Sequence, residues 1–326
     1  MFKFIDFHCD TLMHGAATDA GFSLHENRNT SIDFARMKKA GSLAQFFAIF
    51  LPTDEMYLRH AGKVMDDDEY IDRLVSKFHQ EIDEWKAIIG FAGNYNDILE
   101  NENQGKMSGI LTIEDGRSVG GKLEKLKTYY EKGVRLIGLT WNFENCFGYP
   151  NSGDISIMEK GLKKFGREAV QYMNELGMII DVSHLSDGGF YDVAKISNKP
   201  FIASHSNARE ISPHKRNLTD DMIRLLGEKG GIAGINFAPQ FLNPDTTNDN
   251  STIELMVMHL NHMKNIGGED IVALGSDFDG IEGNLQVDSV EKIPQIFGAL
   301  KKSGWNENQI EKFAYANAIR VIKETI

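Results

Sequence analysis

Cysteine and long apolar runs are scarce in this sequence. Only Cys9 and Cys146 occur among its 326 residues, too few for a disulfide framework and without the spacing of a zinc finger. Cys9 alternates with its neighbours on a predicted strand, so we expect it to be a small buried hydrophobic residue. No apolar run approaches the ~20 residues that a membrane span needs, and neither a secretory nor a lipid-anchor signal is found. We therefore expect a cytoplasmic protein without a membrane partner.

Positive charge is also in short supply. The chain carries 35 Lys and Arg against 47 Asp and Glu, a formal net charge of -12, which repels phosphate backbones and anionic surfaces. We therefore expect no nucleic-acid partner. The sequence has no Gly-x-Gly-x-x-Gly motif, phosphate loop or Gly-x-Ser-x-Gly elbow, which removes the commonest nucleotide-binding and serine-hydrolase classes.

What is present is the composition of an ordinary globular protein, with 41% hydrophobic and 25% charged residues. A single α/β barrel routinely occupies a chain of this length. No Pro-, Gly- or Ser-rich linker or low-complexity segment interrupts the chain. We therefore expect residues 1–326 to form one domain.

Short β-rich runs alternate with helical stretches, as parallel strands joined by crossover helices do. The predicted strands cover residues 2–9, 43–51, 108–114, 134–141, 178–184, 201–206, 231–237 and 271–277. Helical periodicity falls between them at 70–89, 123–133, 166–177, 218–230 and 254–267, and the last helices are predicted near 291–301 and 307–324. Eight such units predict an α/β fold, a single (β/α)8 barrel of the TIM type, with a doubly wound open sheet as the alternative.

The chemically active side chains gather at the predicted strand ends, where barrel active sites lie. A strand points residues i and i+2 to one face, so a pair with that spacing can project together into the barrel mouth. His8 and Asp10 have that spacing. The candidates at strand ends are His8, Asp10, Glu114, His184, His205 and Asp277.

These residues favour a metal site when they are taken together. Each could separately be a hydrogen-bonded core histidine or a turn carboxylate, but gathering them in one buried mouth is costly unless cations neutralise them. Imidazole and carboxylate ligands without thiolate suit zinc first, and also manganese or cobalt. Five ligands exceed the needs of one catalytic ion, so we predict two divalent ions bridged by Glu114. His259 and His262, three residues apart on a predicted helix, are expected on a solvated face instead.

With these positions in hand, the chain resembles the membrane (renal) dipeptidase family of dizinc peptidases, as a soluble microbial-type member. The motifs that carry the resemblance are DFHCD (6–10), TIEDG (112–116), DVSH (181–184), SHSNA (204–208), RNLTDD (216–221) and GSDFDG (275–280). The resemblance implies the barrel fold and dipeptide substrates. It also implies that His8 and Asp10 bind one zinc ion, that His184 and His205 bind the other, and that Glu114 bridges them.

The same resemblance implies that Asp277 contacts the bridging water and acts as the catalytic acid–base group. Arg216 would bind the substrate carboxylate. The chain departs from the renal enzyme at LTWN, where Trp141 stands in place of a histidine thought to bind the scissile carbonyl. We expect Trp141 and Asn142 to contact substrate there, Asn142 as a substitute donor and Trp141 as an apolar wall.

The leading hypothesis is a dizinc dipeptidase that cleaves small dipeptides with a metal-bridging hydroxide. A different amidohydrolase, such as a lactonase, a phosphotriesterase-like enzyme or a deaminase, is the alternative, although those sites typically have His-x-His on the first strand. A catalytically inactive metal-binding barrel is the third hypothesis. Barrels often dimerise, so a homodimer is compatible with the sequence, which carries no interface signal.

Overall fold

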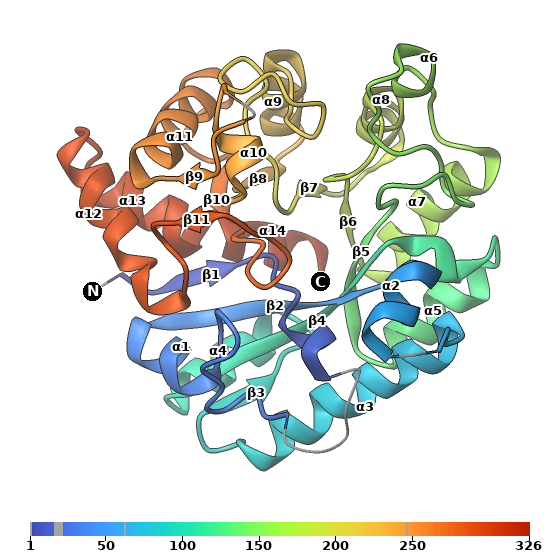
Figure 1. Cartoon of the computed structure of the whole chain (residues 1–326), viewed down its shortest axis with the longest axis horizontal. Helices are drawn as coiled ribbons and strands as arrows, with labels where there is room; N and C mark the ends of the chain where they lie inside the picture. The colour runs from blue at the N-terminus through green and yellow to red at the C-terminus, as the bar shows by residue number, and fades with distance from the viewer. Residues whose placement is uncertain (1, 16–21, 62, 246) are drawn as a thin grey trace.

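Eight parallel strands close into a barrel in the computed structural model, which describes residues 2–15, 22–61, 63–245 and 247–326 (Figure 1). The barrel strands are β1 (Phe4–Asp6), β2 (Ser42–Phe50), β4 (Met107–Glu114), β5 (Val134–Gly138), β6 (Ile179–Asp181), β7 (Ile202–Ala203), β8 (Ile232–Ile235) and β10 (Val272–Leu274). The ring follows chain order and closes where β10 pairs with β1. Each strand coincides with one of the eight predicted runs, so the (β/α)8 barrel is confirmed and the open sheet is excluded.

One strand of the main sheet was not predicted. Helix α3 (Asp67–Glu84) ends before the predicted limit of 89, and Ile89–Phe91 forms β3. β3 pairs with the start of β4, while β5 pairs further along and β2 runs along β4 over most of its length. Ile88 and Ile89, which precede Gly90, are compatible with the end of a helix or with a short strand. Hydrophobic periodicity cannot distinguish the two over so few residues, so it did not predict β3. Any side chain at Gly90 would displace Asn101, since an added Cβ would lie 2.1 Å from Asn101 Oδ1.

Helices surround the ring of strands (Figure 1). They are α1 (Phe34–Ala40), α2 (Asp54–Ala61), α4 (Tyr95–Asn103), α5 (Leu123–Glu131), α6 (Ile155–Met158), α7 (Lys164–Leu176), α8 (Asp187–Ile196), α9 (Asp220–Glu228), α10 (Pro239–Leu242), α11 (Ile253–Gly267), α12 (Pro294–Lys302), α13 (Glu307–Glu311) and α14 (Asn317–Thr325). Thr219 caps α9 and Gly177 ends α7 in the left-handed conformation that glycine tolerates best. In the described part of the chain, no helix combines the length and apolarity needed to cross a bilayer.

Side-chain alternation along the strands divides the core in two. Ile5, Ile110 and Ile232 belong to an inner cluster on which α14 packs through Val321. Their strand neighbours, such as Leu111, join the cluster shared with the surrounding helices. Cys9 is fully buried in that outer cluster, as expected. The inner cluster and α14 fill the barrel below, which leaves the carboxyl ends of the strands for polar groups.

A small sheet of β9 (Asn250–Ser251) and β11 (Asn284–Leu285) lies outside the ring. It joins the segment after β8 to the segment after β10. Both segments follow the carboxyl ends of barrel strands. The loops at this end of the barrel are therefore tied to one another as well as to the strands.

Candidate metal centre

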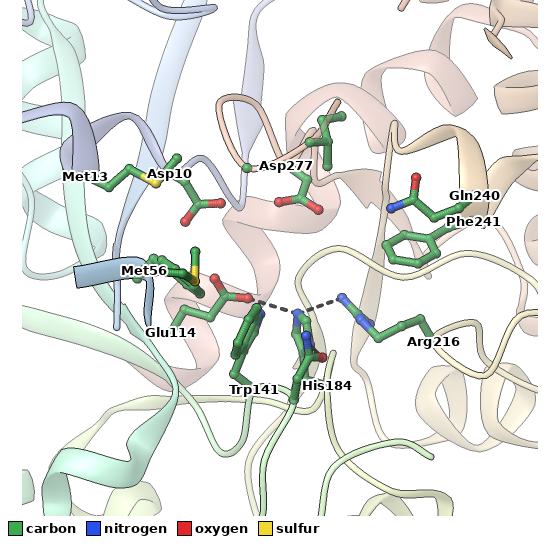
Figure 2. A pocket seen from close by; sticks show the side chains of 14 residues that line it. Asp10, Met13, Met56, Glu114, Trp141, His184, Arg216, Gln240, Phe241 and Asp277 are labelled. Carbon is green, nitrogen blue, oxygen red and sulfur yellow. Dashed lines mark hydrogen bonds and ion pairs between the residues drawn. The ribbon is translucent and has the colours of Figure 1, made fainter. Parts of the chain in front are cut away.

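The predicted ligands come together at the carboxyl ends of the strands. Figure 2 shows Asp10, Glu114 and His184 of this set, with Asp277 beside them. They form three overlapping groups whose ligand atoms lie within 4.8 Å of one another. The groups are His8, Asp10 and Glu114; Glu114, His184 and His205; and His8, His205 and Asp277. β1, β4, β6, β7 and β10 supply them, each from its last residue or the loop that follows. The predicted cluster therefore exists in space.

Glu114 lies between the two sets of ligands. Its Oε1 is 2.9 Å from His184 Nε2 and 3.5 Å from His205 Nε2. Its Oε2 is 3.6 Å from His8 Nε2, and Asp10 Oδ2 is 3.4 Å from the same nitrogen. Each carboxylate oxygen thus faces a different set of side chains, as a bridging ligand would.

Hydrogen bonds determine which nitrogen of His184 carries a proton. Arg216 Nη2 lies 2.9 Å from His184 Nε2, and a guanidinium can only donate, so Nε2 is the acceptor. The proton is then on Nδ1, which donates to Asn142 Oδ1 at 3.3 Å. Nε2 therefore carries no hydrogen and lies 2.9 Å from Glu114 Oε1, itself an acceptor. Two acceptors this close are stabilised by a cation between them.

Burial shifts the pKa values of Asp277 and His184 in opposite directions. Burial raises the pKa of Asp277 to about 8, where nearby His8 opposes the shift and Asp10 and Glu114 add to it. Burial and the Arg216 charge lower the pKa of His184 to about 4. The fold therefore crowds carboxylates that repel one another beside a His184 imidazole that stays neutral, which is an arrangement that a divalent cation relieves.

Two ligand atoms also lack partners. His8 Nε2 and Asp10 Oδ1 are buried and have no hydrogen-bond partner among the described residues. A buried polar atom without a partner costs roughly 1 to 3 kcal/mol. Both residues belong to one of the three ligand groups, so they fit divalent metal on chemistry and on geometry.

The loop after β10 approaches Asp10 unusually closely. Asp277 and Asp279 adopt positive φ angles of 62° and 69°, a conformation that residues other than glycine rarely take. Gly280 then packs against the cluster, and an added Cβ there would lie 2.0 Å from Asp10 Oδ2. Any larger residue at 280 would displace a predicted ligand.

Asn236 is a site residue that the sequence analysis missed. It follows β8, is fully buried, and donates from Nδ2 to Asp277 Oδ2 at 2.8 Å. The same amide reaches His205 O at 3.3 Å. Its place near the carboxyl end of the predicted strand 231–237 was the available signal, but a single asparagine has no ligand pattern to distinguish it.

Arg216 is buried in the wall of the same cavity. Its Nη1 donates to Ser183 O and, at 3.2 Å, to Ser206 Oγ, while its buried Nε has no partner among the described residues. Burial lowers its pKa to about 10, so it remains a cation at neutral pH. Figure 2 shows its guanidinium directed at His184 on the side of the cavity that Gln240 and Phe241 line.

Trp141 and Asn142 lie three and four residues beyond the end of β5, which stops at Gly138 and not at the predicted residue 141. Both line the cavity. The Trp141 ring packs edge-on against Phe50, with centroids 4.9 Å apart, and its centroid is 6.3 Å from that of His184. Asn142 contacts His184 itself, so the amide supports a predicted ligand.

The cavity in front of the cluster has a volume of about 260 Å³. Its lining residues are Asp10, Met13, Phe50, Met56, Glu114, Trp141, Asn142, His184, Arg216, Gln240, Phe241, Asp277, Gly280 and Ile281. In Figure 2, Met13 and Met56 lie on the Asp10 and Glu114 side, across the cavity from Arg216. The space is therefore apolar at one end, cationic at the other, and lined by acids and imidazoles between them.

The expectation for His259 was wrong. His259 is fully buried, its Nδ1 accepts the Ala208 N–H at 3.1 Å, and its Nε2 is 3.0 Å from Leu242 O. It ties α11 to the loops after β7 and β8. His262 is half-buried and pairs with Asp220 at 2.6 Å. An i,i+3 spacing does not say which face of a helix is covered.

Known proteins similar to this chain were found by sequence and by structure. The sequence model described as membrane dipeptidase, peptidase family M19, matches residues 1–326. An uncharacterized dipeptidase of Schizosaccharomyces pombe is 31% identical over 319 residues, 94% of this chain and 75% of that protein. An uncharacterized protein in the pqqA 5' region of Klebsiella pneumoniae is 38% identical over 221 residues, 66% of this chain and 80% of that protein. A crystal structure of a metallo peptidase from Rhodobacter sphaeroides, liganded with a phosphinate mimic of the dipeptide L-Ala-D-Ala, superposes with a TM-score of 0.91 at 26% identity, covering 100% of this chain and 99% of that one.

Proposed function

The chain belongs to the membrane dipeptidase family, peptidase family M19, and from this membership we propose that it is a two-metal dipeptidase that hydrolyses the amide bond of small dipeptides. The observation that carries the proposal is Glu114, whose two carboxylate oxygens face separate sets of ligands. A Rhodobacter sphaeroides metallo peptidase of the same fold, 26% identical to this chain, is liganded with a dipeptide mimic. Arg216, Trp141 and Asn142, the residues predicted to bind substrate, line the cavity in front of the ligand cluster.

Two divalent ions, with zinc preferred, would be held by His8 and Asp10 on one side and by His184 and His205 on the other, with Glu114 shared. When bound, such ions acidify a shared water and polarise the scissile carbonyl. The protein's contribution is to hold the imidazoles with Nε2 directed inward and to exclude bulk water from the cluster. The buried, partnerless Nε2 of His8 supports this assignment.

Asp277 is proposed to move the proton between the attacking water and the leaving amine. Asn236 holds its Oδ2 at 2.8 Å, while Oδ1 faces His8 Nε2 at 3.7 Å. Oδ2 is thereby held by a hydrogen bond, while Oδ1 faces the ligand cluster. The positive φ of Asp277 aims the side chain into the cavity at a cost in backbone strain, as is common at functional positions.

The substrate is proposed to lie across the cavity from its cationic to its apolar end. Arg216 would bind the terminal carboxylate, because a buried guanidinium with an unpaired Nε can bind a planar anion strongly. The N-terminal side chain would then face Phe50, Met56 and Trp141. Flexible methionine and a broad aromatic ring accept varied apolar side chains, so we expect a preference for apolar N-terminal residues.

A panel of dipeptides of both chiralities, assayed together with metal analysis, tests the proposal. We expect hydrolysis of dipeptides that have a free carboxylate and an apolar first residue, and its loss when a chelator removes the metal. Turnover confined to lactones, phosphotriesters or aminated bases would instead place the protein in another amidohydrolase class. No turnover of any substrate by fully metallated protein would favour an inactive metal-binding barrel.

A further inference from the structure

Two buried aspartates lie directly behind the ligand cluster, one in each half of the barrel mouth. Asp181 is the last residue of β6, and Asp6 is the last residue of β1. Asp181 accepts both the backbone N–H and the hydroxyl of Ser204, at 2.9 and 2.6 Å. Asp6 accepts the same two groups of Ser276, at 2.8 and 2.6 Å. The two pairs connect neighbouring strands, β6 with β7 and β1 with β10.

Each serine immediately precedes a predicted site residue, so the two pairs look equivalent at first. Ser204 is followed by His205, and Ser276 by Asp277. In both cases the aspartate also accepts the N–H of the residue two positions after itself, Ser183 at 3.0 Å and His8 at 3.4 Å. Each pair therefore fixes the backbone from which ligands project.

The two serine hydroxyls differ in what else they contact. Ser204 Oγ lies 2.7 Å from His205 Nδ1. Ser276 Oγ, by contrast, contacts the backbone oxygen of His8 at 3.2 Å, and no imidazole contact of this hydroxyl occurs among the described residues. Of the two pairs, the one on the β6 and β7 side alone contacts a ligand ring within the part of the chain that the structure describes.

The direction of these bonds follows from the donor inventory. A carboxylate only accepts, so the single hydroxyl hydrogen of Ser204 points to Asp181 Oδ2. Ser204 Oγ must then accept a hydrogen from His205 Nδ1. This places the imidazole proton on Nδ1 and leaves the Nε2 lone pair facing Glu114 Oε1 at 3.5 Å. That is the tautomer that binds metal through Nε2.

We propose that Asp181 and Ser204 form a positioning relay that holds His205 in its metal-binding tautomer and orientation, and that the Asp6 and Ser276 pair has no such effect on a ring. The proposal rests on the proposed function in so far as His205 binds metal. Asp181 and Ser204 are positioning residues, since neither lines the cavity. Groups that orient a metal-ligating histidine typically change metal affinity by 10- to 100-fold when removed.

Ser204→Ala, with Ser276→Ala as the matched control, tests the relay. Zn²⁺ affinity is measured by competition with a chromophoric chelator, and the two sites are followed with Co²⁺ absorption. We expect Ser204→Ala to weaken binding of one of two ions by about 10- to 100-fold, and Ser276→Ala to weaken that ion by no more than about threefold. Equal losses in the two variants, or no loss in either, would overturn the proposal.

A second measurement distinguishes a changed tautomer from a general loosening. In metal-free protein labelled with ¹⁵N-histidine, NMR should report His205 protonated at Nδ1, and Ser204→Ala should mix the two tautomers. Asp181→Asn gives the same information if Ser204→Ala does not fold, because an amide can turn the Ser204 hydroxyl toward Nδ1. A pure Nδ1–H tautomer in these variants would contradict the relay.

Failure of the relay and failure of the proposed function give different results. If wild-type protein binds two ions but cleaves no dipeptide, the function is wrong, while the affinity comparison still decides the relay. If wild-type protein cleaves dipeptides and Ser204→Ala binds Zn²⁺ as tightly as wild type, the relay is wrong and the function stands.

Discussion

The two halves of the metal centre are built in different ways. The carboxylate half, His8, Asp10 and Asp277, is shaped chiefly by backbone: two positive φ angles in the loop after β10 and the close approach of Gly280, with a hydrogen bond from Asn236 to Asp277. The imidazole half, His184 and His205, is shaped by side chains, because Asn142 and Ser204 accept hydrogen bonds from the Nδ1 atoms of the two rings. A ligand set can thus be aimed by chain geometry or by polar partners. The two halves should consequently fail under different substitutions.

Among residues that are not predicted metal ligands, Gly280→Ala should have the largest effect, because it alters the backbone that shapes the carboxylate half. The new Cβ would fall 2.0 Å from Asp10 Oδ2, so this short buried side chain must move. We expect a folded protein that loses one ion and nearly all dipeptidase turnover, measured by metal analysis and assay. Gly298→Ala, where an added Cβ meets nothing within 4 Å, is the control. Full metal content in Gly280→Ala would show that the approach has no functional consequence.

Asp277→Asn separates chemistry from metal binding within the same half. Asn keeps the shape but cannot accept a proton, so we expect kcat to fall on the order of 100-fold or more while both ions remain bound. Steady-state kinetics with parallel metal analysis checks this. A kcat close to that of wild type would remove Asp277 from the mechanism, and loss of an ion would make it a ligand.

Arg216→Ala probes the imidazole half from the substrate side. Losing a charged partner for the carboxylate should lower kcat/KM for free dipeptides by roughly 10- to 100-fold. C-terminally amidated dipeptides should change far less. Because Arg216 also donates to His184 Nε2, an equal loss on both substrate types would mean that the residue chiefly supports the ligand.

Trp141 should give the smallest effect, since its ring adjoins the imidazole half without bonding to it. Trp141→Ala should remove about fivefold preference for apolar N-terminal residues, the worth of roughly 1 kcal/mol of apolar contact. Trp141→His should relax the same preference and raise turnover of small dipeptides by restoring a donor near the carbonyl. If both variants match wild type on every substrate, the ring does not contact the substrate.

The sequence was sufficient for the barrel because eight apolar runs of strand length alternate with helical periods. It failed at β3, where Ile89–Phe91 is too short for its period to be read. It also failed at His259, because spacing alone did not reveal that α11 buries the face shared with Met256 and Met263.

The predicted ligands could be found because histidines and acids at strand ends stand out. The residues that hold these side chains in place could not be found in this way. Asn236, Ser204 and Ser276 are common residue types whose role depends on distances between strands far apart in sequence. The restriction at Gly280 likewise depends on where the Asp10 carboxylate lies, which no local pattern specifies.

The central claim is that Glu114 joins two halves that each hold an ion, and the metal content of wild type and Glu114→Ala tests it most directly. Both proteins are saturated with Zn²⁺, freed of excess metal and analysed for zinc per chain, with folding checked by circular dichroism. The account predicts about two ions in wild type and fewer than one in Glu114→Ala, because five ligands exceed the needs of one catalytic ion and the shared carboxylate is lost. A wild type that stays at one ion, or a Glu114→Ala protein that keeps both, would contradict it.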